Sequence, residues 1–210
     1  MEIFITSVRA GDNDDVAICF EMRDGENRCA KSLLIPIAVY TQFSLSVGKT
    51  DREFFDVVEK ESKIYLAYRK ALYLLSFGSL SAKMLQRKLL ARGYEPEFVF
   101  LAIERLKDNH LLSEEDSAIR EAEKCAEKLW GENRIRSHLA TKGYGAEEIK
   151  KAFWALEDNG VDFTLNCSKL IEKRYLPLSK DKKELQKTIA ALTRYGYTIS
   201  QIKESILKLT

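Results

Sequence analysis

The chain has 210 residues, of which 45% are hydrophobic and 31% charged, a composition typical of a folded globular protein and too apolar for a disordered one. No segment approaches the roughly 18–20 uninterrupted apolar residues of a membrane-spanning helix. The first ten residues lack a basic region followed by an apolar block, so we expect no export signal and a cytoplasmic location.

The net charge of +2 is divided unevenly along the chain. Residues 1–62 contain 7 Lys and Arg against 12 Asp and Glu, whereas residues 63–210 contain 27 against 20. This asymmetry favours an anionic partner for the C-terminal two thirds. Solvated helix faces rich in Lys and Glu are the alternative explanation.

The four cysteines do not form a metal-binding motif: Cys19, Cys29, Cys125 and Cys167. No CxxC pair or Cys/His cluster is present, so we expect no zinc site. Cys19 and Cys29 flank a predicted hairpin turn and could lie close together across two strands. A disulfide is disfavoured in a reducing compartment, so we expect these cysteines to be small buried apolar residues.

The first third of the chain has the period-two alternation of β-strands. Val16, Ile18 and Phe20 would share one face of a strand. Asp24-Gly25 favours a hairpin turn, and Pro36 disfavours a central strand but suits the first turn of a helix. We expect strands over residues 3–8, 15–22 and 27–33, and a short helix over 37–43.

From Asp51 onward the apolar spacing becomes helical. One long helix, or two helices broken near Glu61-Ser62, should connect the strands to the rest of the chain. We therefore expect a small antiparallel β-rich N-terminal domain with short helices over residues 1–62, and a helical region over residues 63–210.

The helical region repeats itself. Gly93-Tyr94, Gly143-Tyr144 and Gly196-Tyr197 lie 50 and 53 residues apart, and each pair stands between two amphipathic segments. Each glycine suits the left-handed position after a helix. Counting one preceding helix per copy, we predict a mainly α, overall α+β protein with three three-helix repeats, at about 63–112, 113–162 and 163–210. Neighbouring units of this size must stack to bury their apolar faces.

Catalytic motifs are absent from the sequence. His110 and His138 have no metal-ligand spacing, and we find no phosphate-binding loop, GxGxxG fingerprint or GxSxG elbow. We therefore expect no catalytic residues, no metal and no cofactor, and interpret the chain as a non-enzymatic binding protein.

Basic residues recur in the repeats. In the first repeat, like charges four residues apart on one helix repel each other unless an anion neutralises them. The candidate contacts are Lys83, Arg87, Lys88 and Arg92 in the first repeat, and Arg134, Arg136, Lys142, Lys150 and Lys151 in the second. The third repeat adds Lys169, Lys173, Arg174, Lys180, Lys182, Lys183 and Lys187. The tyrosines after the repeat glycines are better explained by packing than by base stacking.

Two segments carry a family resemblance: residues 80–118 (LSAKMLQRKLLARGYEPEFVFLAIERLKDNHLLSEEDSA) and residues 130–153 (WGENRIRSHLATKGYGAEEIKKAF). Both segments resemble the RecX family of RecA regulators. The resemblance implies a regulator of DNA repair and recombination that binds the RecA filament on single-stranded DNA. Closed repeats with an N-terminal cap suit a monomer. It also implies suppressed ATP hydrolysis and strand exchange, with direct DNA contact left open. A stand-alone DNA-binding protein that uses its basic helices is the alternative.

Overall fold

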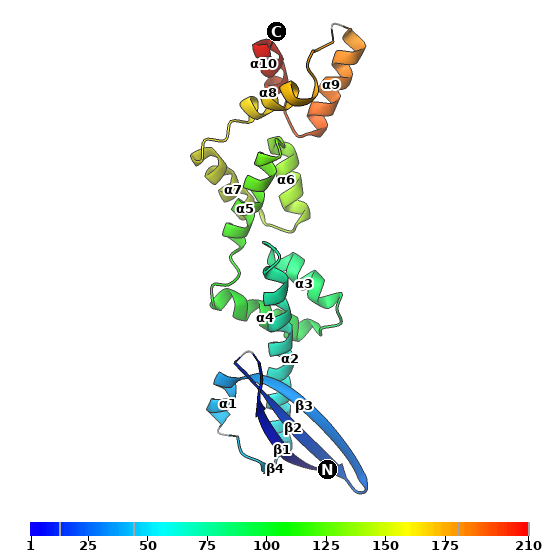
Figure 1. Cartoon of the computed structure of the whole chain (residues 1–210), viewed down its shortest axis with the longest axis vertical. Helices are drawn as coiled ribbons and strands as arrows, with labels where there is room; N and C mark the ends of the chain where they lie inside the picture. The colour runs from blue at the N-terminus through cyan, green and yellow to red at the C-terminus, as the bar shows by residue number, and fades with distance from the viewer. Residues whose placement is uncertain (13, 44, 180, 210) are drawn as a thin grey trace. The chain divides into compact units, whose positions relative to one another are not determined.

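The computed structural model describes residues 1–12, 14–43, 45–179 and 181–209 (Figure 1). The strands are β1 (Glu2–Ala10), β2 (Asp15–Asp24), β3 (Asn27–Pro36) and β4 (Gly48–Thr50). The helices are α1 (Ile37–Phe43), α2 (Arg52–Leu75), α3 (Ala82–Leu90), α4 (Pro96–Asp108), α5 (Glu114–Glu127), α6 (Glu132–Thr141), α7 (Ala146–Asp158), α8 (Phe163–Arg174), α9 (Lys182–Arg194) and α10 (Ile199–Leu209). Within the described ranges, no helix is long and apolar enough to cross a membrane.

The chain forms two compact units. The first unit contains Met1–Phe77 and Gln86–Leu111, and the second contains Gly78–Leu85 and Leu112–Thr210. The predicted class, an antiparallel β-rich domain followed by helical repeats, is confirmed. The domain bounds drawn from the sequence stay predictions.

In the first unit, the strands form an antiparallel sheet in the order β3-β2-β1-β4. A two-residue turn joins β2 to β3, with Asp24 paired to Asn27 and Gly25 at a φ of +61°. Pro36 ends β3, which is an edge strand and therefore tolerates a residue without an N–H group. Helix α1 starts directly afterwards, as the sequence predicts.

The prediction that Cys19 and Cys29 are buried in the sheet is wrong. Cys19 lies opposite Ser32, and Cys29 lies opposite Met22. Three residues of strand, roughly 10 Å, therefore separate the two cysteines along the ladder, beyond the roughly 7 Å reach of a disulfide. Cys29 is exposed and Cys19 is half-buried, which contradicts the expected burial, whereas Cys125 and Cys167 are buried.

Helix α2 is one continuous helix across Glu61-Ser62, the point where the sequence also allowed a break. Its N-terminal half buries Phe55 and Val58 against one face of the sheet. Phe55 meets Phe20 edge to face, with 5.0 Å between ring centroids. Ser62 is buried because its hydroxyl accepts a hydrogen bond from the Leu34 amide at 3.1 Å.

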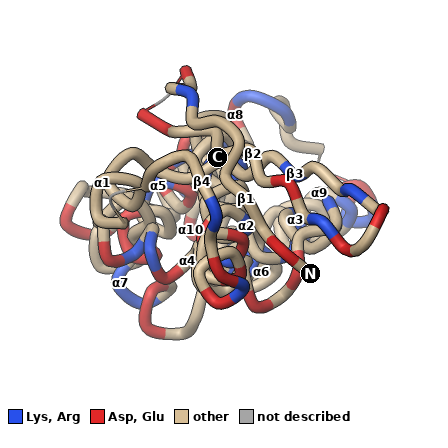
Figure 2. Tube along the Cα trace, turned by 90° about the horizontal axis from the view of Figure 1, so that it is seen from below, with Lys and Arg blue, Asp and Glu red and all other residues tan. Residues whose placement is uncertain are grey.

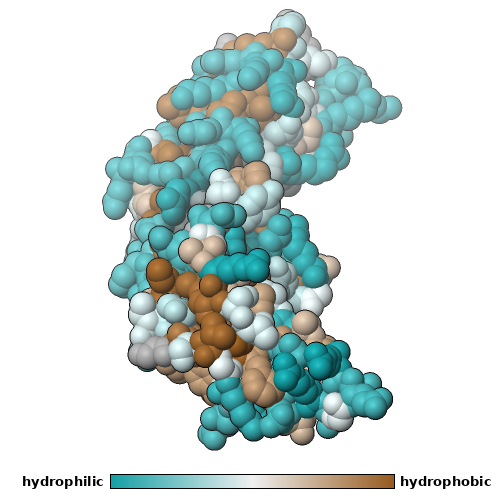
Figure 3. Space-filling model, turned by 60° about the horizontal axis from the view of Figure 1, so that its bottom comes forward, coloured by the Kyte–Doolittle hydropathy of each residue, from teal (hydrophilic) through white to brown (hydrophobic). Residues whose placement is uncertain are grey.

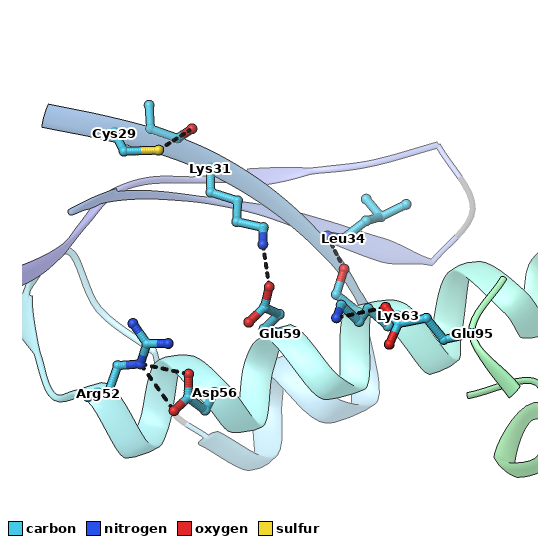
Figure 4. A network of polar contacts seen from close by, with 10 residues as sticks. Cys29, Lys31, Leu34, Arg52, Asp56, Glu59, Lys63 and Glu95 are labelled. Atoms are coloured by element: carbon cyan, nitrogen blue, oxygen red, sulfur yellow. Dashed lines mark hydrogen bonds and ion pairs between the residues drawn. The ribbon is translucent and has the colours of Figure 1, made fainter. Parts of the chain in front are cut away.

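The C-terminal half of α2 packs against α4 instead. Ile64 and Ala67 share a core with Phe98 and Ala102. Ion pairs at the rim of this contact join Lys60 to Glu97, Lys63 to Glu95 and Arg105 to Glu61, with N···O distances of 2.9, 3.0 and 3.1 Å. Figure 4 shows Lys63, which pairs with Glu95, on the same helix as Glu59, which pairs with Lys31 of β3. Helix α2 therefore belongs to both the sheet layer and the first helical layer.

The second unit holds two further three-helix clusters, α5–α7 and α8–α10, each with its own core. Polar side chains cap helices in both clusters. The Ser113 hydroxyl accepts from the Asp116 amide at 3.1 Å. Thr198 and Gln201 form a reciprocal capping box at 2.9 and 3.3 Å.

The repeat glycines all end a helix in the same way. Gly93, Gly143 and Gly196 have φ values of +85°, +89° and +98°. After α6, the Gly143 and Tyr144 amides donate to the carbonyls of Ala140 and Leu139 at 2.9 and 3.2 Å. The same two bonds follow α3 and α9. Tyr144 and Tyr197 are buried, which confirms the packing interpretation for both.

Candidate functional site

Helix α3 and the turn that follows it carry four cations. Lys83, Arg87 and Arg92 are exposed and Lys88 is half-buried. Within the part of the chain that the structure describes, none of the four makes an ion pair. Arg92 instead donates from Nη1 to the Lys88 carbonyl at 2.8 Å, near the helix C-terminus, where a positive charge is favourable. These four residues are called the α3 cations below.

The candidate cations of the second repeat already have partners. Arg136 pairs with Glu132 at 2.7 Å and lies 4.0 Å above the Phe153 ring. Lys151 pairs with Glu115, which raises the pKa of the lysine above its usual value. The other partners are Glu121 for Lys142, at 2.7 Å, and the exposed Trp154 ring for Lys150, at 4.7 Å.

Arg134 lies within the packing between the second and third repeats. Its guanidinium is stacked 3.9 Å from the Trp130 ring centroid and 5.1 Å from that of Tyr195. The aromatic rings remove much of its surface from solvent, so it is a half-buried structural residue here. The basic residues of the third repeat have different surroundings. Lys187 pairs with Glu184, Arg174 contacts Tyr195, and Lys180 lies outside the described residues.

The candidate contacts do not all occupy equivalent positions. With Gly93 aligned to Gly143, the burial of residues 81–90 and 131–140 follows the same pattern. In this register Arg92 corresponds to Lys142, whereas Lys88 corresponds to His138. Arg134 and Arg136 correspond to the uncharged Met84 and Gln86. The two basic helices therefore present different charge patterns. Figure 2 shows acidic and basic residues interspersed along the chain.

The middle helices of successive repeats meet end to end. At the start of α6, the Gly131 amide donates to the Tyr195 carbonyl at 2.8 Å, and the Asn133 amide donates to the Gly196 carbonyl at 3.1 Å. At the start of α3, the Ser81 hydroxyl donates to the Lys142 carbonyl. The N-terminus of each of these two helices thus uses the free carbonyls at the C-terminus of the next middle helix.

The sequence did not predict a cluster formed by Glu121, Cys125 and His138. One ligand atom from each of these residues lies within 4.8 Å of the other two. His138 Nε2 is 2.8 Å from Glu121 Oε1, and the Trp130 ring meets the imidazole edge to face at 5.2 Å. The i, i+4 spacing of Glu121 and Cys125 was visible in the sequence. His138 was not, because only the packing of α6 on α5 brings it there.

Electrostatics in this cluster favour a charged Glu121. Burial raises the pKa of the Glu121 carboxyl, but the hydrogen bonds from Lys142 and His138 outweigh it, and the pKa falls below its usual value. Burial raises the pKa of the Cys125 thiol, and the neighbouring carboxylate adds to the increase. Burial and Glu121 also raise the pKa of Tyr144 to about 12.

Most of the face in Figure 3 is hydrophilic, with one compact apolar patch and further apolar residues elsewhere on the face. One opening, about 680 Å³, lies beside β1 and β4 and is lined by residues that include Ile3, Phe43 and Phe54. It brings together no group of catalytic side chains.

The fold and surface define a class: a helical-repeat protein with an N-terminal antiparallel sheet and a basic helix in its first repeat. Residues 67–106 match the family model described as RecX, first three-helix domain. Two relatives carry the name Regulatory protein RecX. The Xanthomonas axonopodis pv. citri protein is 33% identical over 136 residues, covering 64% of this chain and 82% of the relative. The Halorhodospira halophila protein is 28% identical over 134 residues, covering 63% and 81%. The chain belongs to the RecX family.

Two solved structures share the fold. One, described as a crystal structure of regulatory protein RecX, has a TM-score of 0.73 at 22% identity and covers 96% of this chain and 99% of its own. RecX from Lactobacillus salivarius has a TM-score of 0.61 at 21% identity, covering 70% and 96%.

Proposed function

We propose that this protein is a non-enzymatic cytoplasmic regulator that binds RecA on single-stranded DNA as a monomer and suppresses ATP hydrolysis and strand exchange. Family membership carries the proposal, since the relatives are named as regulatory proteins. Direct contact with DNA phosphates is part of it.

The α3 cations are the proposed contacts. An unpaired cation can neutralise a phosphate without first giving up an internal partner, and an exposed Arg or Lys loses little solvation in doing so. Lys142, Lys150 and Lys151 would have to leave Glu121, Trp154 and Glu115 first. We therefore rank the α3 cations above the second-repeat cations as partner contacts.

The test is RecA ATPase on single-stranded DNA, with the full-length protein added up to equimolar amounts. We expect the rate to fall, and the triple variant Arg87→Ala, Lys88→Ala, Arg92→Ala to need at least about tenfold more protein for the same inhibition. Each phosphate that the variant no longer neutralises keeps its counterions, so the free energy of their release no longer favours binding. Unchanged ATPase and strand exchange with the wild-type protein would rule out the proposal.

A charge-matched control separates contact from net charge. Arg9→Ala, Arg28→Ala and Lys49→Ala remove the same number of cations from the sheet. This variant should inhibit RecA like the wild type. Equal losses in both triple variants would contradict the assignment to α3.

The alternative is a stand-alone DNA-binding protein, which the same unpaired cations favour. It predicts tight binding to free duplex DNA and no dependence on RecA. A gel-shift titration with duplex and single-stranded oligonucleotides, in the presence and absence of RecA, distinguishes the two functions.

A further inference from the structure

We propose that Glu121, Cys125 and His138 form a binding site for a divalent transition metal of the zinc class. The three residues combine a carboxylate, a thiol and an imidazole, the donor types that zinc takes in proteins. Their ligand atoms all lie within 4.8 Å of one another. Tetrahedral zinc holds its ligand atoms roughly 3–4 Å apart, so only small side-chain shifts are needed.

Two packed helices position the donors. Glu121 and Cys125 are four residues apart on α5, the spacing that places two ligands on one helix face. His138 comes from α6, where Ile135 and Leu139 pack into the same core as Cys125. Because the backbone on both sides is fixed by packing, the site would need little ordering on metal binding.

The surroundings suit a metal site in which three coordination positions are taken by protein side chains and the fourth is open to solvent. Cys125 is 1% exposed, whereas the His138 side chain is 28% exposed, so the ion can enter from the imidazole side. Trp130 covers the imidazole edge and keeps the site partly dry. Water would complete the tetrahedron. Tyr144, in the same core, has a buried hydroxyl with no hydrogen-bond partner among the described residues.

Lys142 competes with the metal. Its ammonium lies 2.7 Å from the Glu121 oxygen that also contacts His138. Metal binding would move this ammonium into solvent, which the 31% exposure of the lysine side chain allows. The Cys125 thiol would release its proton to solvent as the metal–sulfur bond forms.

Cobalt(II) titration of the full-length protein tests the site, with zinc added afterwards as competitor. The background is Cys29→Ser, which removes the exposed thiol, and the reductant is a phosphine without thiols. We expect one equivalent of cobalt to give a thiolate-to-metal charge-transfer band that zinc abolishes. No band at stoichiometric cobalt would overturn the proposal.

Matched variants locate the ligands. Cys125→Ala should abolish the band, whereas Cys167→Ala, which removes another buried thiol from the second unit, should leave it intact. A band that survives Cys125→Ala in a folded protein would overturn the site.

Two milder variants keep the test decisive if Cys125→Ala fails to fold. His138→Asn should weaken cobalt binding at least tenfold, while Lys142→Met should strengthen it by removing the competing ammonium. Unchanged affinity in His138→Asn would overturn the site, and weaker binding in Lys142→Met would contradict the competition.

Discussion

Arg134 and Arg87 show how the surroundings of a residue decide what a basic side chain can do. Both are Arg residues on a middle helix. Arg134 is stacked between Trp130 and Tyr195 and helps to join two repeats, whereas Arg87 is exposed and has no ion-pair partner among the described residues. The sequence did not distinguish Arg134 from Arg87, because it does not show which aromatic rings of the third repeat contact Arg134.

The same junction makes Gly196 unusually sensitive. A Cβ at Gly196 would lie 2.4 Å from the backbone nitrogen of Arg134, and the residue has a φ of +98°. Gly160 has a comparable φ of +72° but open space around it. We predict that Gly160→Ala costs about 1–2 kcal/mol from backbone strain alone, and that Gly196→Ala costs at least about 1 kcal/mol more.

Urea unfolding followed by tryptophan fluorescence measures the difference, since Trp130 lies at the junction. Equal losses of stability in the two alanine variants would show that the backbone around Gly196 relaxes without cost.

At the scale of elements, helix ends marked by proline or glycine could be predicted from the sequence. That one helix, α2, packs against both the sheet and α4 could not. Pro36 located the start of α1, and the repeat glycines located three helix ends. The continuity of α2 was left open, because Glu61-Ser62 reads as a polar interruption of an amphipathic pattern. Ser62 is buried and accepts a hydrogen bond from the Leu34 amide of β3, a partner 28 residues away.

The candidate site was also predicted from the sequence only in part. Local spacing located the α3 cations, but it did not show that the second-repeat cations have partners, since Glu115 and Glu121 reach them from α5. Long-range pairings of this kind depend on the packing of whole helices.

Helix α2 yields a prediction about the first unit. Phe55→Ala removes a ring that is 2% exposed and packs against Phe20, so we expect a loss of about 3–5 kcal/mol. Val57→Ala, on the same helix at 41% exposure, should change stability by no more than about 0.5 kcal/mol. Urea unfolding measures both variants, and amide hydrogen exchange should show faster exchange in β2 for Phe55→Ala. A loss below about 1 kcal/mol would mean that the sheet does not depend on α2.

Over the whole molecule, net charge is a poor guide to binding capacity. Residues 63–210 carry seven more basic than acidic residues, yet three of the cations in the second repeat are already neutralised by Glu115, Glu121 and Glu132. The α3 cations have no such partner among the described residues. The number of cations available to an anion is therefore smaller than the composition indicates.

This difference predicts how binding to single-stranded DNA responds to salt. If Arg87, Lys88 and Arg92 each contact one phosphate, replacing all three with Ala should reduce the slope of log affinity against log salt by roughly 2. Replacing Arg136, Lys142 and Lys151 removes the same formal charge but frees three carboxylates, so the slope should change by less than about 1. Fluorescence anisotropy of a labelled oligonucleotide across a salt series gives both slopes. Identical slopes for the two variants would mean that DNA responds to net charge alone, and that the unpaired state of α3 has no bearing on binding.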